Sequence, residues 1–368
     1  MTAAIRQWET LGLVVLVASV AVSCQVVSGL REENDSAGLR IEKAKQFTFN
    51  GWASEIAFSQ KGNALAIAGC QDSNANGDAD CSDGILQFWN LEDAGQHSAL
   101  LFPDAITALA ISPDGSKWAL GDAKGRLIQS TATSGLTRKP LYHKDRITAL
   151  AFSPDGKWVA SGSLDPTFPL GFMDVASRGV IKVKMAFEPV SALAFSPDGK
   201  DLAVGTIKGQ LVIWPYSSRS TPVVISSSGG ESHAITSIAF SADGHLLAYS
   251  RQNGNTVVMD RRTGVELSRR KNGVAVSSLA FAPDSLHLAV AQENGKVIIF
   301  ETQNSQVIWT KWHIGPVSGL AYSPDGASLA VVSQRHVYLY HVNGRPYSLL
   351  PKLGPLQSGP EGQVRETR

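Results

Sequence analysis

The sequence predicts an all-β fold: a seven-bladed β-propeller in which each blade is a four-stranded antiparallel sheet. One short apolar segment recurs seven times and ends at Phe58, Ile111, Phe152, Phe195, Phe240, Phe281 and Tyr322. After the first interval the copies are spaced by about 41 to 45 residues, the length of one supersecondary unit in a repeat protein. Such a unit cannot bury its own apolar faces, so the copies must stack or close into a ring.

A turn motif separates the first two strands of each unit. Ser-Pro-Asp-Gly stands intact at residues 112–115, 153–156, 196–199 and 323–326, and these residue types match the preferences of a type I turn. The flanking segments are short, apolar and unbroken, which is typical of strands covered on both faces. A third strand is expected at positions such as 84–90, 209–214 and 295–300, and a fourth at 306–312.

On this strand–turn–strand core the chain resembles the WD40-repeat family, from about residue 41 to residue 342. The family's Trp-Asp pair is replaced by Trp89-Asn90, Trp214-Pro215 and Met259-Asp260. Its Gly-His pair is reduced to a lone His143, His233 or His313. These departures concern the family's His–Ser–Asp hydrogen-bond network and leave the fold untouched. We interpret the three histidines as structural turn residues.

Closing the ring requires a last strand from one end of the chain. Residues 45–50 precede the first repeat and are expected to complete the blade begun by 317–342; residues 345–350 are the alternative. The predicted organisation is a leader or anchor (1–24), a linker (25–40), the propeller (41–350, with an insertion at 71–83) and an unfolded tail (351–368). The tail is rich in Pro, Gly and charge, a composition that disfavours a packed core.

The N-terminus predicts export to the cell envelope. Leu11–Leu30 carries no charge and follows Arg6, as in a membrane span or a secretory signal. The run from Ala21 to Cys24 resembles the bacterial lipobox, which implies lipidation of Cys24. A lipoprotein, an uncleaved anchor and cleaved soluble export all place the propeller outside the cytoplasm; a cytoplasmic chain with an apolar start is the remaining alternative. We expect attachment to the membrane through the N-terminus.

An insertion of about 12 residues lengthens the first repeat, between the second and third strands of its blade. Cys70 and Cys81 flank it and are expected to form a disulfide, as an even pair in an exported protein suggests. Starting at Asp72, the ligand positions of an EF-hand loop are filled, with Gly77 at the sharp turn and Asp83 where the pattern expects a final Glu. The candidate calcium ligands are Asp72, Asn74, Asn76, Asp78 (through its carbonyl), Asp80 and Asp83. The loop resembles those of dockerin-like modules; the alternative is a hairpin extension rich in turn residues.

No feature of the sequence indicates an enzyme. The net charge of +1 favours no nucleic-acid partner. The Gly-x-Ser-x-Gly elbow, the phosphate-binding loop and the His-Glu-x-x-His motif are all absent. We therefore predict a non-enzymatic platform that binds other proteins. A propeller enzyme of the metal-dependent hydrolase or lactonase type and a small-ligand or glycan binder are the alternatives.

Two sets of residues are candidates for contact with a partner. The first lies in turns that enter first strands, a face shared with the calcium loop in WD40 relatives: Lys144, Asp145, Arg146, Trp312 and His313. The second is a charged cluster at the third-to-fourth-strand turn of the fifth blade: Arg261, Arg262, Arg269, Arg270 and Lys271. This cluster either meets an acidic partner or anionic lipid, or guards an outer strand against edge pairing. We favour the second interpretation.

Overall fold

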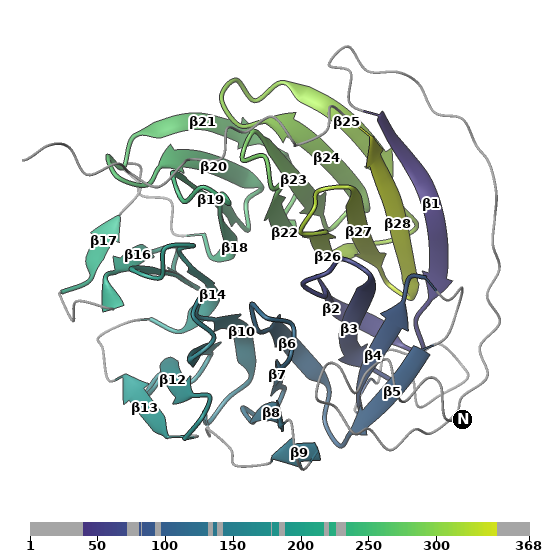
Figure 1. Cartoon of the computed structure of the whole chain (residues 1–368). Coiled ribbons are helices and arrows are strands. Elements are labelled where there is room, and N and C mark those ends of the chain that lie inside the picture. The colour runs from purple at the N-terminus through teal and green to yellow at the C-terminus, as the bar shows by residue number, and fades with distance from the viewer. Residues whose placement is uncertain are drawn as a thin grey trace, which may run out of the picture.

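The computed structural model describes residues 40–71, 81, 83–92, 97–131, 135–137, 143–177, 179–183, 188–216, 221–225 and 233–343. These residues form seven four-stranded antiparallel sheets arranged as blades round a central axis (Figure 1), as the sequence predicts. The first strand of each repeat lies at the centre of the ring and the last at the rim.

In blades 1 to 6 the strands pair in chain order. Blades 1 to 3 consist of β2 (Trp52–Phe58), β3 (Ala64–Cys70), β4 (Gly84–Asn90), β5 (His97–Phe102); β6 (Ile106–Ile111), β7 (Trp118–Asp122), β8 (Leu127–Thr131), β9 (Gly135–Thr137); β10 (Ile147–Phe152), β11 (Trp158–Ser163), β12 (Leu170–Asp174), β13 (Val180–Val183). Blades 4 to 6 consist of β14 (Val190–Phe195), β15 (Leu202–Thr206), β16 (Leu211–Trp214), β17 (Val223–Ile225); β18 (Ile235–Phe240), β19 (Leu246–Arg251), β20 (Asn255–Asp260), β21 (Glu266–Lys271); β22 (Val276–Phe281), β23 (His287–Gln292), β24 (Lys296–Glu301), β25 (Val307–Trp312).

Blade 7 joins the two ends of the propeller. It contains β26 (Val317–Tyr322), β27 (Ser328–Ser333) and β28 (His336–Asn343), with β1 (Arg40–Thr48) paired antiparallel to β28 at the rim. The prediction that an N-terminal strand closes the ring is therefore confirmed, but the strand spans Arg40–Thr48 and not the expected 45–50. The competing residues 345–350 lie outside the described part. The closing strand also contacts blade 1, because the ring centroids of Phe47 and Trp89 lie 4.6 Å apart.

The predicted turn motif forms as expected. In blade 3 the Ser153 hydroxyl donates to an Asp155 carboxylate oxygen at 2.6 Å and accepts a hydrogen bond from the Trp158 amide at 2.9 Å. Gly156 takes a φ of 68°, which is the left-handed region that glycine enters without strain. The motif thus fixes the angle at which the second strand leaves the first.

Neighbouring blades approach closely at a glycine in the second strand. A Cβ atom on Gly121 would lie 2.4 Å from a side-chain carbon of Ile147, the first residue of the next innermost strand. Gly162 stands in the same relation to Val190, at 2.4 Å. Each β-branched side chain is fully buried in the space that the glycine leaves. The sequence pattern of small residues in second strands is therefore a packing requirement between blades.

Each innermost strand carries a β-bulge at a hydroxyl residue. The bulged residues are Ser54, Thr107, Thr148, Ser191, Thr236, Ser277 and Ser318. In five blades the hydroxyl donates to a carbonyl at the first or second residue of the next innermost strand; Thr107, for example, reaches the Ile147 oxygen at 2.6 Å. These hydrogen bonds link successive blades around the channel.

Candidate interaction face and the blade 1 insertion

The connections that enter innermost strands share one face of the ring with the turns between second and third strands; we call it the entry face. Backbone hydrogen bonds tie the two sets together. The Leu164 amide donates to the Arg146 carbonyl in blade 3, and the Ile207 amide donates to the Pro189 carbonyl in blade 4. The entry face therefore has an ordered backbone between its exposed side chains.

Lys144, Asp145 and Arg146 form the entry to blade 3, and all three are exposed. A hydrogen bond to a buried side chain fixes their backbone: the Lys144 amide donates to the carboxylate of Asp165 at 2.9 Å. The Ser163 hydroxyl donates a hydrogen bond to the Asp145 carbonyl at 2.9 Å. The structure therefore presents these three charged side chains on a rigid turn, away from the residues at the entry to blade 7.

Trp312 and Ile314 stand at the entry to blade 7. They are 60% and 69% exposed, more than any other large apolar side chain among the described residues. The Lys296 ammonium lies 5.6 Å from the centre of the Trp312 ring, within the range of a cation–π contact. Sequence reasoning identified Trp312 but missed Ile314, which no pattern distinguishes from a buried residue of the repeat.

His313 lies between these two exposed residues and faces inward. Its Nδ1 donates to the Gly295 carbonyl at 3.2 Å, so Nε2 is free to accept from the Tyr340 hydroxyl at 2.9 Å. Burial lowers the pKa of His313 from 6.5 to about 4, so the ring is neutral at physiological pH. His313 therefore holds the turn that presents Trp312 and Ile314, and offers a partner little surface of its own.

His143 has a similar structural role at the entry to blade 3. The buried ring donates from Nδ1 to the Phe168 carbonyl at 2.8 Å, and Nε2 accepts from the Ser161 hydroxyl at 2.8 Å. Blade 3 thus contains the His–Ser part of the network that the resemblance implies. For His143 and His313 the interpretation as structural turn residues agrees with these contacts.

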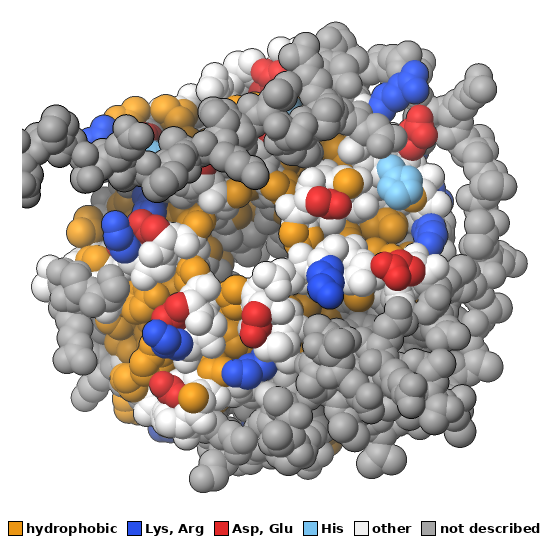
Figure 2. Space-filling model, viewed as in Figure 1, with side chains coloured by type: hydrophobic (Ala, Val, Ile, Leu, Met, Phe, Trp, Pro, Cys, Tyr) orange, Lys and Arg blue, Asp and Glu red, His pale blue; other side chains and the backbone are white. Residues whose placement is uncertain are grey.

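Two arginines of the charged cluster of blade 5 form ion pairs with other residues of the propeller. Arg261 reaches across to blade 4, with Nη2 at 2.5 Å from Asp201 and 3.1 Å from Asp198. Arg269 pairs with Glu266 on its own strand at 2.6 Å. Among the described residues of the face seen in Figure 2, acidic and basic side chains are dispersed and form no large patch of one sign. The cluster therefore serves packing and strand protection more directly than binding.

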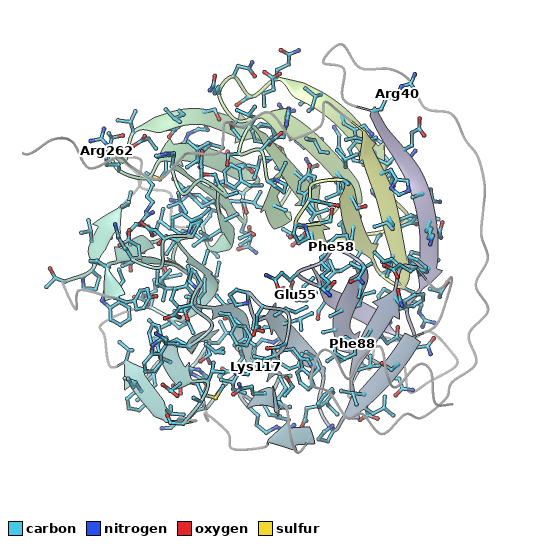
Figure 3. All side chains as sticks on the ribbon, in the orientation of Figure 1. Arg40, Glu55, Phe58, Phe88, Lys117 and Arg262 are labelled. Atoms are coloured by element: carbon cyan, nitrogen blue, oxygen red, sulfur yellow. A yellow bond between two sulfur atoms is a disulfide. The ribbon has the colours of Figure 1, made fainter. Side chains whose placement is uncertain are left out.

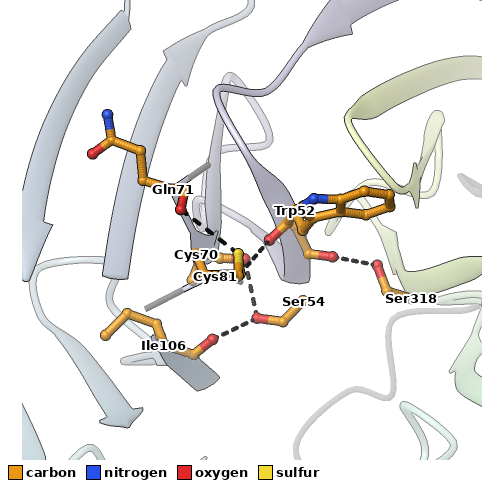
Figure 4. Close-up of a disulfide and its surroundings, with 9 residues drawn as sticks. Trp52, Ser54, Cys70, Gln71, Cys81, Ile106 and Ser318 are labelled. Atoms are coloured by element: carbon orange, nitrogen blue, oxygen red, sulfur yellow. Dashed lines mark hydrogen bonds between the residues drawn. A yellow bond between two sulfur atoms is a disulfide. The ribbon is translucent and has the colours of Figure 1, made fainter. Parts of the chain in front are cut away.

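The blade 1 insertion is described only at its ends. Asp72, Asn74, Asn76, Asp78 and Asp80 lie outside the described residues. The expected disulfide joins Cys70 to Cys81 (Figure 4), with 5.5 Å between their Cα atoms. The Gln71 amide also donates to the carbonyl of Asp83, whose side chain is exposed. The two ends of the insertion are thus clamped together on the entry face.

Glu55 is a candidate binding residue in the central channel, and sequence reasoning missed it. It lies on β2 and points towards the middle of the ring (Figure 3). Burial raises the pKa of Glu55 from 4.5 to about 8. Aligning the repeats would have revealed it, because the innermost strands β2, β6, β10, β14, β18, β22 and β26 contain no other charged residue.

The residues expected to attach the protein to a membrane, and all of the expected calcium ligands except Asp83, lie outside the described part of the chain. Cys24 and Leu11–Leu30 lie outside the described residues. In the part of the chain that the structure covers, no helix is long and apolar enough to cross a membrane. No group of three or more His, Cys, Asp or Glu residues there is arranged to hold a metal ion.

Two family models match parts of the chain. Residues 189–348 match one described as the lipoprotein LpqB beta-propeller domain, and residues 137–168 match one described as WD domain, G-beta repeat. The chain has no significant match among curated proteins. The seven blades and these two matches together support a β-propeller of the WD40 type.

Proposed function

We propose that this propeller is a non-enzymatic platform that binds another protein on its entry face, at Trp312 and Ile314. The observation that carries the proposal is the exposure of these two large apolar side chains, which lie on either side of His313 where the chain leaves β25. Trp is among the residues most enriched at the energetic centres of protein interfaces. A partner that covers both side chains would gain roughly 25 cal/mol for each Å² of apolar surface removed from water.

Rigidity of the turn supports the same conclusion. His313, between the two exposed residues, is held by Tyr340 and Gly295, and the Lys296 side chain lies over the Trp312 ring. A side chain already fixed in place loses little conformational entropy when a partner binds. Lys144, Asp145 and Arg146 carry exposed charge on the same face and would act as a second, weaker contact through charge complementarity.

Attachment to the cell envelope is the second part of the proposal. The match to the LpqB lipoprotein propeller domain and the lipobox-like run that ends at Cys24 both favour a lipoprotein with the propeller outside the cytoplasm. Cys24→Ala in a bacterial host should abolish fatty-acid labelling and leave an uncleaved precursor. Mature wild-type protein that retains residues 1–23 would favour an uncleaved anchor instead.

A structural calcium ion in the blade 1 insertion is the third part. The disulfide and the Gln71–Asp83 hydrogen bond hold the ends of the insertion together. Alternating oxygen-bearing side chains around Gly77 have the spacing that a calcium loop requires. An ion there would order the insertion, whose described ends lie on the same face as the proposed partner site.

The platform is tested by affinity capture of the anchored, full-length protein after cross-linking in cells. Trp312→Ala and Ile314→Ser should each lose a partner that the wild type retains. Leu286→Ala is the matched control, because Leu286 is also 53% exposed but lies in a first-to-second-strand turn on the opposite face. Recovery of the same partners by all four proteins would refute a role for the entry face.

A further inference from the structure

One residue of the central channel departs from the pattern of the other blades. Glu55 is the first residue after the bulge of β2 and pairs with Ala68. The same register position in blades 2 to 7 holds Ala108, Ala149, Ala192, Ser237, Ser278 and Gly319. Packing between blades is therefore satisfied by a small residue at this position, and the fold does not require a carboxylate there.

The surroundings of Glu55 offer it no partner. β2 packs against β3, β6, β26 and β27, whose titratable groups are Tyr322 and the disulfide-bonded Cys70. Among the described residues the Glu55 carboxyl makes no hydrogen bond and no ion pair, and desolvation is the only cause that shifts its pKa. Glu55 as a whole is half-buried, and the ring is hollowed at its centre on the face shown in Figure 2.

We propose that the central channel binds a primary ammonium group through the carboxylate of Glu55. An alkylammonium matches the setting, because the positions equivalent to Glu55 in the other six blades hold only Ala, Ser or Gly, small uncharged residues beside which an alkyl stem fits. A single carboxylate balances one positive charge. A calcium ion, by contrast, takes six or more oxygen ligands. This site is distinct from the Trp312 surface and does not depend on the proposed platform function.

Binding at this site is coupled to a proton. Removal of water raises the pKa of Glu55 to about 8, so the carboxyl is mostly protonated at pH 7. An ammonium pairs with the ionised form, so its binding at pH 7 releases the carboxyl proton to solvent. The apparent affinity follows the ionised fraction and should rise at least about tenfold from pH 6 to pH 8, while the amine stays protonated throughout.

The test measures n-butylammonium binding to the oxidised, full-length protein by calorimetry in buffers of different ionisation enthalpy. The wild type should bind saturably and release a proton at pH 7. Glu55→Gln, which keeps the shape, and Glu55→Ala, which installs the residue of blades 2 to 4, should lose at least tenfold in affinity. Glu293→Gln, at an exposed position of the entry face, should bind as the wild type does.

Three results would overturn the proposal: no saturable binding by the wild type, equal binding by Glu55→Gln, or an affinity that does not change between pH 6 and pH 8. Thermal melting of each variant serves as the control that it is folded. Nα-acetyl-lysine amide, which carries the same ammonium on a peptide unit, identifies the source. Tighter binding of this compound than of n-butylammonium indicates a lysine side chain of a protein, and weaker binding indicates a free amine.

Discussion

The Ser318 hydroxyl donates a hydrogen bond to the Ala53 carbonyl, 2.7 Å away, and so joins blade 7 to blade 1 across 265 residues of sequence (Figure 4). The hydroxyl of Ser54 makes the same contact one blade further on, with the Ile106 carbonyl at 3.0 Å. At Ser191 the equivalent hydroxyl is buried without a partner among the described residues. This hydrogen bond therefore joins the ring at its closure. Among the described residues it is missing between blades 4 and 5, and between blades 5 and 6, where Thr236 contacts the Ser250 hydroxyl instead.

Ser318→Ala should lower the free energy of unfolding by about 1 kcal/mol, because it leaves the Ala53 carbonyl without its donor. Ser191→Ala is the matched control. It removes a hydroxyl that makes no hydrogen bond in the described structure, so stability should stay the same or increase. Urea denaturation of both variants measures the difference; equal losses would show that the hydroxyl contacts do not stabilise the ring.

The sequence was sufficient to predict the parts of the fold that repeat. The turn around Asp155, the apolar strands on either side and the closing strand with Phe47 all follow from local residue preferences and from the count of strands. The Cys70–Cys81 disulfide followed from their position around a polar insertion. Each of these depends on neighbours in sequence or on the periodicity of the chain.

Features that depend on contacts between blades were beyond that reasoning. Arg261 belongs by sequence to a charged run, yet its partners Asp198 and Asp201 lie in the preceding blade. His313 and Trp312 are adjacent, yet one faces Tyr340 and the other faces solvent. Which side of a short turn faces inward is decided by packing, and one sequence does not contain that information.

The closing strand gives a second prediction. A protein that lacks residues 1–39 retains β1 and should melt as the full-length chain does. A protein that lacks residues 1–50 leaves the edge of β28 unpaired. That strand carries the apolar residues Val337 and Leu339, which are buried in the intact protein, so the truncated protein should aggregate. Melting temperature and light scattering of the two truncations check this. Equal solubility would indicate closure by a different segment.

Calcium gives a third prediction. If the insertion binds the ion only in the folded state, calcium at ten times Kd should stabilise the protein by about 1.4 kcal/mol. Protection of residues 70–84 from proteolysis is the more direct measurement. Asp72→Ala should abolish that protection, and reduction of the disulfide should weaken it. Asp145→Ala, an exposed acidic residue on the same face, should retain it. Loop cleavage that is indifferent to calcium in the wild type would show a plain hairpin extension.

The contact between blades 4 and 5 gives the last prediction. Arg261→Met keeps an aliphatic stem over Phe240 but removes the charge that Asp198 and Asp201 share. The loss of stability at neutral pH should be on the order of 1–3 kcal/mol, since these are charge-assisted hydrogen bonds at a partly buried site. Arg262→Met, at an exposed position, should change stability by less than about 0.5 kcal/mol.

The pH dependence of that loss identifies its electrostatic part. Burial of Asp198 opposes its ionisation, but hydrogen bonds from Ser196 and Arg261 outweigh burial and lower the pKa from 3.8 to about 2. A carboxyl whose pKa is lower in the folded state stabilises the protein above its unfolded value, and this contribution disappears as the pH falls through the folded value. The difference between wild type and Arg261→Met should therefore be full above pH 4 and shrink towards pH 2. A difference that stays constant over this range would mean that Arg261 stabilises the seam between the blades by packing alone.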